Sequence, residues 1–133
     1  MSMSARDSVV YDSGALIAVD SGRNKSAANR HREFLTHEKR ILVPTVVAAQ
    51  VVRKPAAQVP LMLALRGCEL VPFTAAHHAP VGQLLATSGT ADVVNAFVAL
   101  LAARTGAMVV SSDPGDIGHL LSCLGVRRPV LKI

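Results

Sequence analysis

The stretch Ala107-Met108-Val109-Val110-Ser111-Ser112-Asp113-Pro114-Gly115-Asp116 decides the fold class of this chain. Its apolar half predicts a buried strand that ends at two serines. Pro114 suits the first turn of a following helix, and Asp113 suits the N-cap position just before it. In an open α/β sheet, ligands bind beyond the carboxyl ends of the strands. The two carboxylates after this strand therefore lie where a functional site is expected.

The N-terminal part of the chain repeats this arrangement. Residues 8–11 predict a short apolar strand, and Asp12 follows it directly. In a parallel sheet the carboxyl ends of the strands lie on one edge. Two strand-terminal aspartates, Asp12 and Asp113, therefore predict one shared acidic site built from opposite ends of the chain.

Apolar runs and helix-like segments alternate along the rest of the chain. Further strands are predicted at 40–43, 68–71 and 129–133, the last at a sheet edge. Helices are predicted at 12–18, 26–37, 45–51, 56–66, 74–87, 91–105 and 114–124. Pro80 is expected to kink or divide its helix, and Thr90 is expected to cap the next one. Because hairpin signals are absent from the sequence, residues 1–133 predict a single three-layer α/β domain with a mainly parallel central sheet and helices on both faces.

The charge balance favours an anionic partner. The net charge is +5 and the isoelectric point is about 9.9, values typical of proteins that bind nucleic acid. Six basic residues cluster in one short segment: Arg23, Lys25, Arg30, Arg32, Lys39 and Arg40. A solvated helix face is the alternative explanation of this cluster.

Other features of composition restrict the class of protein. The two cysteines, Cys68 and Cys123, provide neither a disulfide framework nor metal-ligand spacing. The N-terminus lacks an apolar signal segment, and the longest uncharged apolar run, 93–103, is too short to span a bilayer. We therefore expect a cytoplasmic protein that is not associated with a membrane.

Six polar residues form the candidate site. They are Asp12, Gln50, Asp92, Asn95, Asp113 and Asp116. Gathered carboxylates repel one another, and a divalent cation relieves that repulsion. Oxygen ligands suit Mg²⁺ or Mn²⁺ rather than Zn²⁺. Such an ion can activate a water molecule and hold phosphate oxygens during hydrolysis.

Each acid also has a purely structural explanation. Asp12 could belong to a turn and Asp113 could simply cap a helix. Asp92 and Asp116 could complement helix dipoles as first-turn acids. Neutral amides such as Gln50 bind Mg²⁺ weakly, so this position is expected to support the site rather than bind the ion.

Serine and histidine chemistry is less well supported. Ser111 and Ser112 are not accompanied by a recognisable His and Asp pattern, which argues against a serine hydrolase. His77, His78 and His119 do not have metal-ligand spacing. A phosphate-accepting receiver domain would need paired acids after the first strand, and this sequence does not have them.

Four segments of the sequence carry a family resemblance: 9–18, 43–53, 91–96 and 109–116. Taken in this order, they resemble the PIN-domain family, and within it the VapC-type toxins of bacterial toxin–antitoxin pairs. The resemblance implies an α/β nuclease fold whose members cut RNA with Mg²⁺ or Mn²⁺. By this resemblance, the first acidic residue of the family pattern corresponds to Asp12, and the acidic residue at the end of the fourth strand corresponds to Asp113. Asp116 corresponds to an additional acidic residue that many members carry after that one.

Two positions depart from the family pattern. The family usually has Glu at the position of Gln50, and Asp at the position that aligns with Asn95. Asp92, one turn before Asn95, could substitute for that acid. Together with Ser112, the two amides are therefore placed around the metal site or at degenerate acid positions, while Asp12, Asp92, Asp113 and Asp116 remain as ligands.

The leading hypothesis is a Mg²⁺- or Mn²⁺-dependent endoribonuclease that acts as the toxin of a type II toxin–antitoxin system. The RNA backbone would be held by Arg53, Arg23, Lys25 and Arg30. The resemblance also implies a cognate antitoxin and a homodimer. The alternative is a catalytically impaired PIN-fold module that binds RNA or a protein partner without cleaving.

Overall fold

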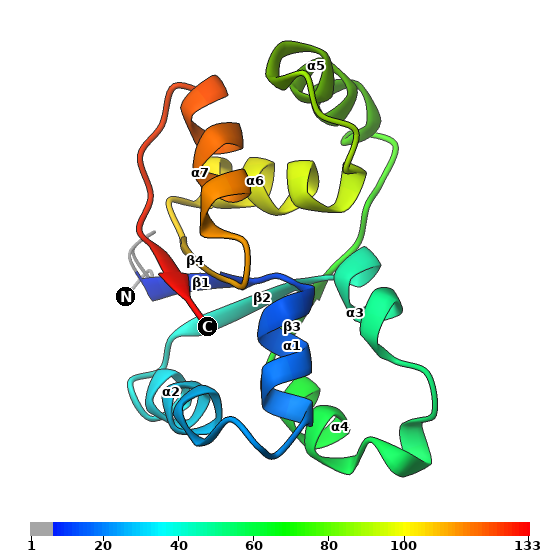
Figure 1. Cartoon of the computed structure of the whole chain (residues 1–133), viewed down its shortest axis with the longest axis vertical. Coiled ribbons are helices and arrows are strands. Elements are labelled where there is room, and N and C mark those ends of the chain that lie inside the picture. Colours follow the sequence, from blue (N-terminus) through cyan, green and yellow to red (C-terminus); the bar gives the residue numbers. More distant parts are fainter. Residues whose placement is uncertain (1–6) are drawn as a thin grey trace.

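Five parallel strands form one sheet in the order β3-β2-β1-β4-β5. The computed structural model describes residues 7–133 (Figure 1). The strands are β1 (Ser8–Tyr11), β2 (Arg40–Pro44), β3 (Glu69–Val71), β4 (Met108–Ser111) and β5 (Val130–Lys132). The first and fourth strands in chain order are therefore neighbours in the sheet, with Tyr11 opposite Val110.

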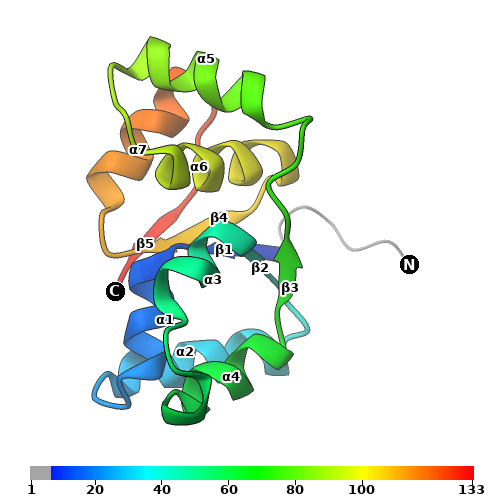
Figure 2. The same ribbon diagram turned by 90° about the vertical axis from the view of Figure 1, so that its right-hand side faces the viewer.

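Helices cover both faces of this sheet. They are α1 (Ser13–Asp20), α2 (Lys25–Thr36), α3 (Thr45–Val51), α4 (Val59–Arg66), α5 (His78–Ser88), α6 (Val93–Thr105) and α7 (Pro114–Cys123). Figures 1 and 2 show α5, α6 and α7 on one side of the strands and α1, α2 and α4 on the other. The predicted three-layer α/β fold is therefore confirmed, and every strand pair in the described part is parallel.

Aliphatic side chains build the core. All four residues of β1 are buried, and six residues of α6 are buried in the layer above it. A helix that is apolar around most of its circumference is buried in this way. Phe97 of α6 is fully buried, and its ring meets the ring of Phe73 edge-on at 5.0 Å between centroids.

Several helices of this protein are apolar, so their length bears on whether one could span a membrane. Within residues 7–133 no single helix is both long and apolar enough to cross a bilayer, and the pair that reaches this length together, α5 and α6, bends by 106° at its junction.

The predicted helix at 56–66 is wrong in its first turn. The structure has a short 3₁₀ helix, η2 (Pro55–Ala57), and α4 begins only at Val59. The side chain of Gln58 explains the break. Its Oε1 accepts hydrogen bonds from the backbone N–H groups of Arg53 and Lys54, and its Nε2 donates to Val51 O at 2.9 Å. Gln58 thus satisfies backbone groups that a continuous helix would have paired.

The predicted boundaries of the next two helices also differ from the structure. The segment before α5 is a turn in which Nδ1 of His77 accepts from the N–H of Thr74 at 2.9 Å. Pro80 therefore lies in the first turn of α5, where a missing N–H costs nothing, and it does not divide the helix. Asp92, rather than Thr90, is the N-cap of α6 because its carboxylate accepts from the N–H of Asn95.

Tyr11 and His31 form a buried polar pair between β1 and α2. The Tyr11 hydroxyl and Nδ1 of His31 are 2.9 Å apart, and the two residues are 2% and 6% exposed. Nε2 of His31 is buried without a hydrogen-bond partner among the described residues. Burial lowers the pKa of His31, so the folded protein favours the neutral ring.

We expect the protein to lose stability as the pH falls below about 6.5, the ordinary pKa of histidine. The unfolded chain takes up a proton at His31 in this range and the folded chain resists it, so the contribution of His31 is lost at acid pH, by at most about 1.4 kcal/mol per pH unit. Urea denaturation from pH 7.5 to pH 5 measures it. His31→Gln, which can still accept from Tyr11, should reduce this pH dependence; an unchanged profile would contradict the assignment.

Candidate active site

The carboxyl ends of the two central strands meet at Asp12 and Ser111. Asp12 follows β1 and Ser111 ends β4, and these residues are 4% and 0% exposed. The hydroxyl of Ser111 donates a hydrogen bond to Oδ2 of Asp12. The same hydroxyl oxygen accepts from the backbone N–H of Asp113 at 2.8 Å. Ser111 therefore links the two strand-terminal aspartates that the sequence predicts to share a site.

A second hydrogen bond orients the Asp12 carboxylate. Its Oδ1 accepts from the N–H of Ala15 at 3.0 Å, which makes Asp12 the N-cap of α1. The turn role considered for Asp12 is thus realised as a helix cap. This cap does not exclude a second role, because an ionised carboxylate offers about four lone-pair sites and these two bonds use only part of them.

The electrostatic environment of Asp12 disfavours its own charge. Burial is the largest cause that raises the pKa of the Asp12 carboxyl, and the nearby charge of Asp113 raises it further. Hydrogen bonds from Ser111 and from the N–H groups of Ala15 and Gly14 oppose this rise. The net effect is a carboxylate whose ionised form is stabilised less than in water. A cation at this position would relieve both the burial cost and the repulsion.

Gly14 allows this site to be compact. A Cβ placed on Gly14 would lie 2.6 Å from Cβ of Ser112 and closer still to its Oγ. Only glycine therefore lets the first turn of α1 lie against the turn that joins β4 to α7. The sequence prediction named Ser112 as the supporting serine, but Ser112 is exposed and it is Ser111 that contacts Asp12. The sequence shows both serines, but it does not show which of the two side chains points into the protein.

Asp92, Asn95 and Asp116 come together in a separate small cavity. This cavity has a volume of about 140 Å³ and lies between the N-terminal turns of α6 and α7. His119 lines it too, and its Nε2 is 2.9 Å from the carbonyl oxygen of Ser88. Since a carbonyl only accepts, Nε2 of His119 carries the proton. Ser88 lies on another helix, α5, so the spacing of residues in the sequence gives no indication of this contact.

The remaining predicted site residues lie outside these clusters. Gln50 is exposed on α3, and none of the described hydrogen bonds involves its side chain. Arg53 donates to the carbonyl oxygens of Ala49 at 2.7 Å and Val52 at 2.9 Å, so it satisfies the end of α3. Arg53 is thereby held by its own helix, which weakens its assignment to RNA.

The donor set fits a cation at two carboxylates. Within residues 7–133 no three His, Cys, Asp or Glu side chains form a group that could hold a metal ion, so the four predicted acids do not make one cage. Mg²⁺ is normally bound through one or two carboxylates and keeps several waters. Asp12 and Asp113 match that mode with hard oxygen donors at one edge of the sheet. They are the residues that would hold such an ion.

The parallel sheet, its order and its two helical layers define a PIN-like α/β protein. The solved structures that share the fold include VapBC2 from Rickettsia felis, bound to a DNA fragment from the promoter, with a TM-score of 0.66 and 17% identity over 94% of this chain and 97% of that chain. PAE2754 from Pyrobaculum aerophilum matches with a TM-score of 0.63 and 15% identity over 95% of this chain and 83% of that chain. The resemblance to VapC-type PIN domains is therefore confirmed at the level of the fold. The sequence matches no family model and no curated protein.

Proposed function

We propose that this chain is a metal-dependent endoribonuclease and the toxin of a type II toxin–antitoxin pair. The observation that carries the proposal is the buried Asp12 joined through Ser111 to Asp113 at the carboxyl edge of the central strands. In α/β sheets this edge is where ligands bind. The fold shared with VapBC2 supports the same assignment.

The reaction adds water across one phosphodiester bond. The water oxygen forms a new bond to phosphorus, one ribose P–O bond breaks, and the leaving oxygen takes up a proton. Mg²⁺ or Mn²⁺, when bound, supplies a water of lowered pKa and neutralises phosphate charge. Asp12 and Asp113 would hold that ion. The Ser111 hydroxyl donates a hydrogen bond to the Asp12 carboxylate, and its oxygen accepts one from the backbone N–H of Asp113, just before α7.

The small cavity of Asp92 and Asp116 would assist the Asp12–Asp113 pair. Asp116 lies in the first turn of α7, three residues after Asp113, so the two acids share one helix end. Asp92 faces the same small cavity from the N-terminus of α6. In this proposal both carboxylates add negative charge beside the Asp12–Asp113 pair and favour a cation there.

The proposed partners are RNA, a cognate antitoxin and a second copy of this chain. The VapBC2 structure is a complex, and this chain spans 97% of the matching chain in it. That likeness supports an antitoxin as the partner. The net charge of +5 supports a polyanionic substrate such as RNA.

A catalytically impaired binding module is the second candidate. Gln50 supplies no carboxylate and lies exposed on α3, and Asn95 lines only the second cavity. Together with the lack of a three-acid group among residues 7–133, these amides favour weak metal binding. In that case the chain would keep the fold and a polyanion surface without hydrolysing its ligand.

A cleavage assay on single-stranded RNA with Mg²⁺ or Mn²⁺ distinguishes the two candidates. We expect wild-type cleavage that stops when a chelator removes the metal. A Gln50→Glu/Asn95→Asp variant restores the acids of the family pattern and should raise the rate, since metal affinity increases with carboxylate charge. If the wild type does not cleave RNA and the double variant does, the impaired binding module is favoured. If neither protein cleaves RNA, the nuclease proposal is contradicted.

A further inference from the structure

Two cavities adjoin on the side of the molecule that holds α1 and α2. The larger, of about 570 Å³, extends from Gly14 and Ser112 to the loop between α1 and α2. The smaller, of about 160 Å³, lies between α2 and the C-terminal strand β5. Both are lined by Asn24, so the two cavities adjoin at this residue and form one depression in two parts. We call this depression the basic groove; it begins at Gly14 and Ser112 and ends at Lys132.

Four cations line the basic groove: Arg23, Lys25, Arg30 and Lys132. None of the described residues that line it is an Asp or a Glu. Arg40 and Glu69 form an ion pair outside the groove, and none of the four groove cations is in an ion pair with another residue in the described part of the chain. Their charged groups are therefore free of carboxylate side-chain partners and can bind an anion.

Two separate parts of the chain build this row of charges. Arg23 and Lys25 come from the start of α2 and the loop before it, whereas Lys132 comes from β5. Arg30 connects them, because its guanidinium is 3.5 Å from the carbonyl oxygen of Lys132. Figures 1 and 2 both place the C-terminal strand beside α1. Lys132 lies far outside the basic cluster seen in the sequence, so only the folded chain brings it into this row.

One end of the groove is at the acidic site. Ser112 lies between Ser111, which binds Asp12, and Asp113. Gly14 is two residues after Asp12 and presents no side chain to a ligand. A chain of phosphates that lies along the groove would thus reach the carboxylates over small residues.

We propose that the basic groove holds the backbone of single-stranded RNA and leads it to Asp12 and Asp113. This inference rests on the proposed function for its direction, since it places the cleaved bond at the Ser112 end. Arg23, Lys25 and Lys132 bind phosphates. No aromatic side chain on which bases could stack is found among the groove's lining residues within 7–133, so the groove binds the RNA backbone and discriminates little between base sequences.

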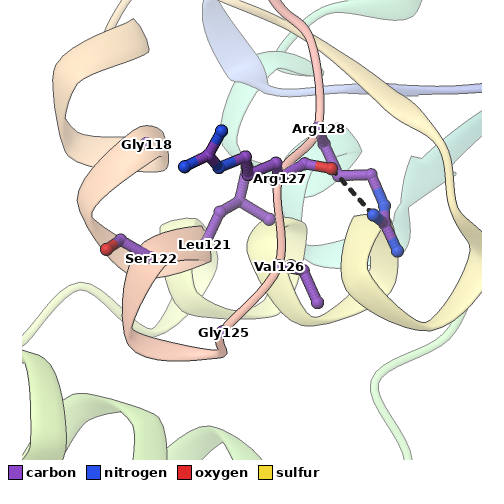
Figure 3. Close-up of a pocket in the computed structure, with 7 residues that line it drawn as sticks. All are labelled: Gly118, Leu121, Ser122, Gly125, Val126, Arg127 and Arg128. Atoms are coloured by element: carbon purple, nitrogen blue, oxygen red, sulfur yellow. Dashed lines mark hydrogen bonds between the residues drawn. The ribbon is translucent and has the colours of Figure 1, made fainter.

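A second arginine-lined cavity is the natural comparison. It has a volume of about 550 Å³ and lies at the C-terminal end of α7, with Arg127 and Arg128 in its lining (Figure 3). Arg128 donates to the carbonyl oxygens of Ala102 and Ala103 at the end of α6, so its charge serves the fold. The cavity extends from Gly118, in the middle of α7, to the segment that follows the helix, and Arg127 comes after the ten residues of α7 that follow Asp113. Arg127 is therefore a suitable control position.

The test is RNA binding without cleavage. Anisotropy of a short fluorescent single-stranded RNA is measured in a chelator, for the wild type and for Arg23→Gln/Lys25→Gln/Lys132→Gln. The side chains changed make no hydrogen bond among the described residues, so this variant should fold normally. At about 0.15 M salt we expect binding to weaken roughly 10- to 50-fold, and the slope of log K against log salt to fall by about 2, since each cation lost removes about 0.7.

The control variant Arg66→Gln/Arg104→Gln/Arg127→Gln removes the same charge from positions that do not line the groove. It should retain the wild-type slope. Equal losses in both variants, or no RNA binding by the wild type, would overturn the proposal. Unchanged RNA binding in the groove variant would also overturn it and would leave an acidic protein segment as the occupant. This binding test does not depend on cleavage. If the wild type binds RNA without cleaving it, and only the groove variant loses binding, the nuclease proposal is contradicted and the groove proposal is supported.

Discussion

Asp12→Asn is expected to abolish metal-dependent RNA cleavage while making the protein more resistant to heat. Loss of one ligand carboxylate removes several kcal/mol of charge stabilisation, which corresponds to a rate lower by about 10³-fold or more. Stability should rise because burial raises the pKa of Asp12, so its ionised form costs free energy at neutral pH. Asparagine caps helices as well as aspartate does, so the bond from Ala15 N–H can be kept.

Cleavage rates and thermal melting at pH 7.5 test both parts of this prediction. Glu33→Gln, an exposed change on α2, is the matched control and should alter neither quantity. A variant that still cleaves at a rate near that of the wild type would remove Asp12 from the reaction. A variant that is inactive but strongly destabilised would indicate that Asp12 maintains the fold and that the loss of activity follows from unfolding. The combination of lost activity and gained stability is typical of a functional carboxylate.

Gly14→Ala should destabilise the protein by about 2 kcal/mol, a value typical of overpacking in a filled interior. The added methyl group would overlap the side chain of Ser112, with only 2.6 Å between the two Cβ atoms. Either α1 or the turn after β4 must then move, and this turn also positions Ser111 and Asp113. Denaturant unfolding measures the loss of stability. The same movement should lower the rate of RNA cleavage.

Gly82→Ala is the control for this change. Gly82 also lies inside a helix, α5, but nothing lies within 4 Å of the position that its Cβ would occupy. Alanine there should stabilise the protein by about 0.5–1 kcal/mol, the usual gain over glycine in a helix. Opposite signs at the two glycines would identify steric contact as the cause. Equal effects at both would show that Gly14 has no special packing role.

Local patterns were sufficient to predict most elements of the fold. The strand at 8–11 and the strand ending at Ser111 are short apolar runs bounded by polar residues, and both were predicted within a residue. The errors lie at helix starts, where a side chain decides which backbone groups need a partner. Gln58 breaks the helix before Val59, and His77 delays the start of α5. Both use hydrogen bonds that hydrophobic periodicity does not encode.

The candidate site shows the same division. Asp12 and Asp113 were predicted to share a site because each follows a strand, and in the structure Ser111 bonds both the carboxylate of Asp12 and the backbone N–H of Asp113. The expectation that Asp92 and Asp116 complete one four-acid cage is not met among residues 7–133, where these two line their own cavity. Their placement depends on how α6 and α7 pack against each other, and the types of the side chains do not determine the angle between the two helices.

The sequence by itself determined the elements, the parallel character of the sheet and the edge at which the acids lie, because these follow from periodicity and from the residues that end each strand. Only the tertiary structure decided which distant residues meet. Ser111 reaches Asp12 across 99 positions and Arg30 reaches Lys132 across 102. Both contacts depend on strand order, which places β4 beside β1 and β5 at the edge. That order is set by burying both faces of the sheet at once, a property of the whole chain.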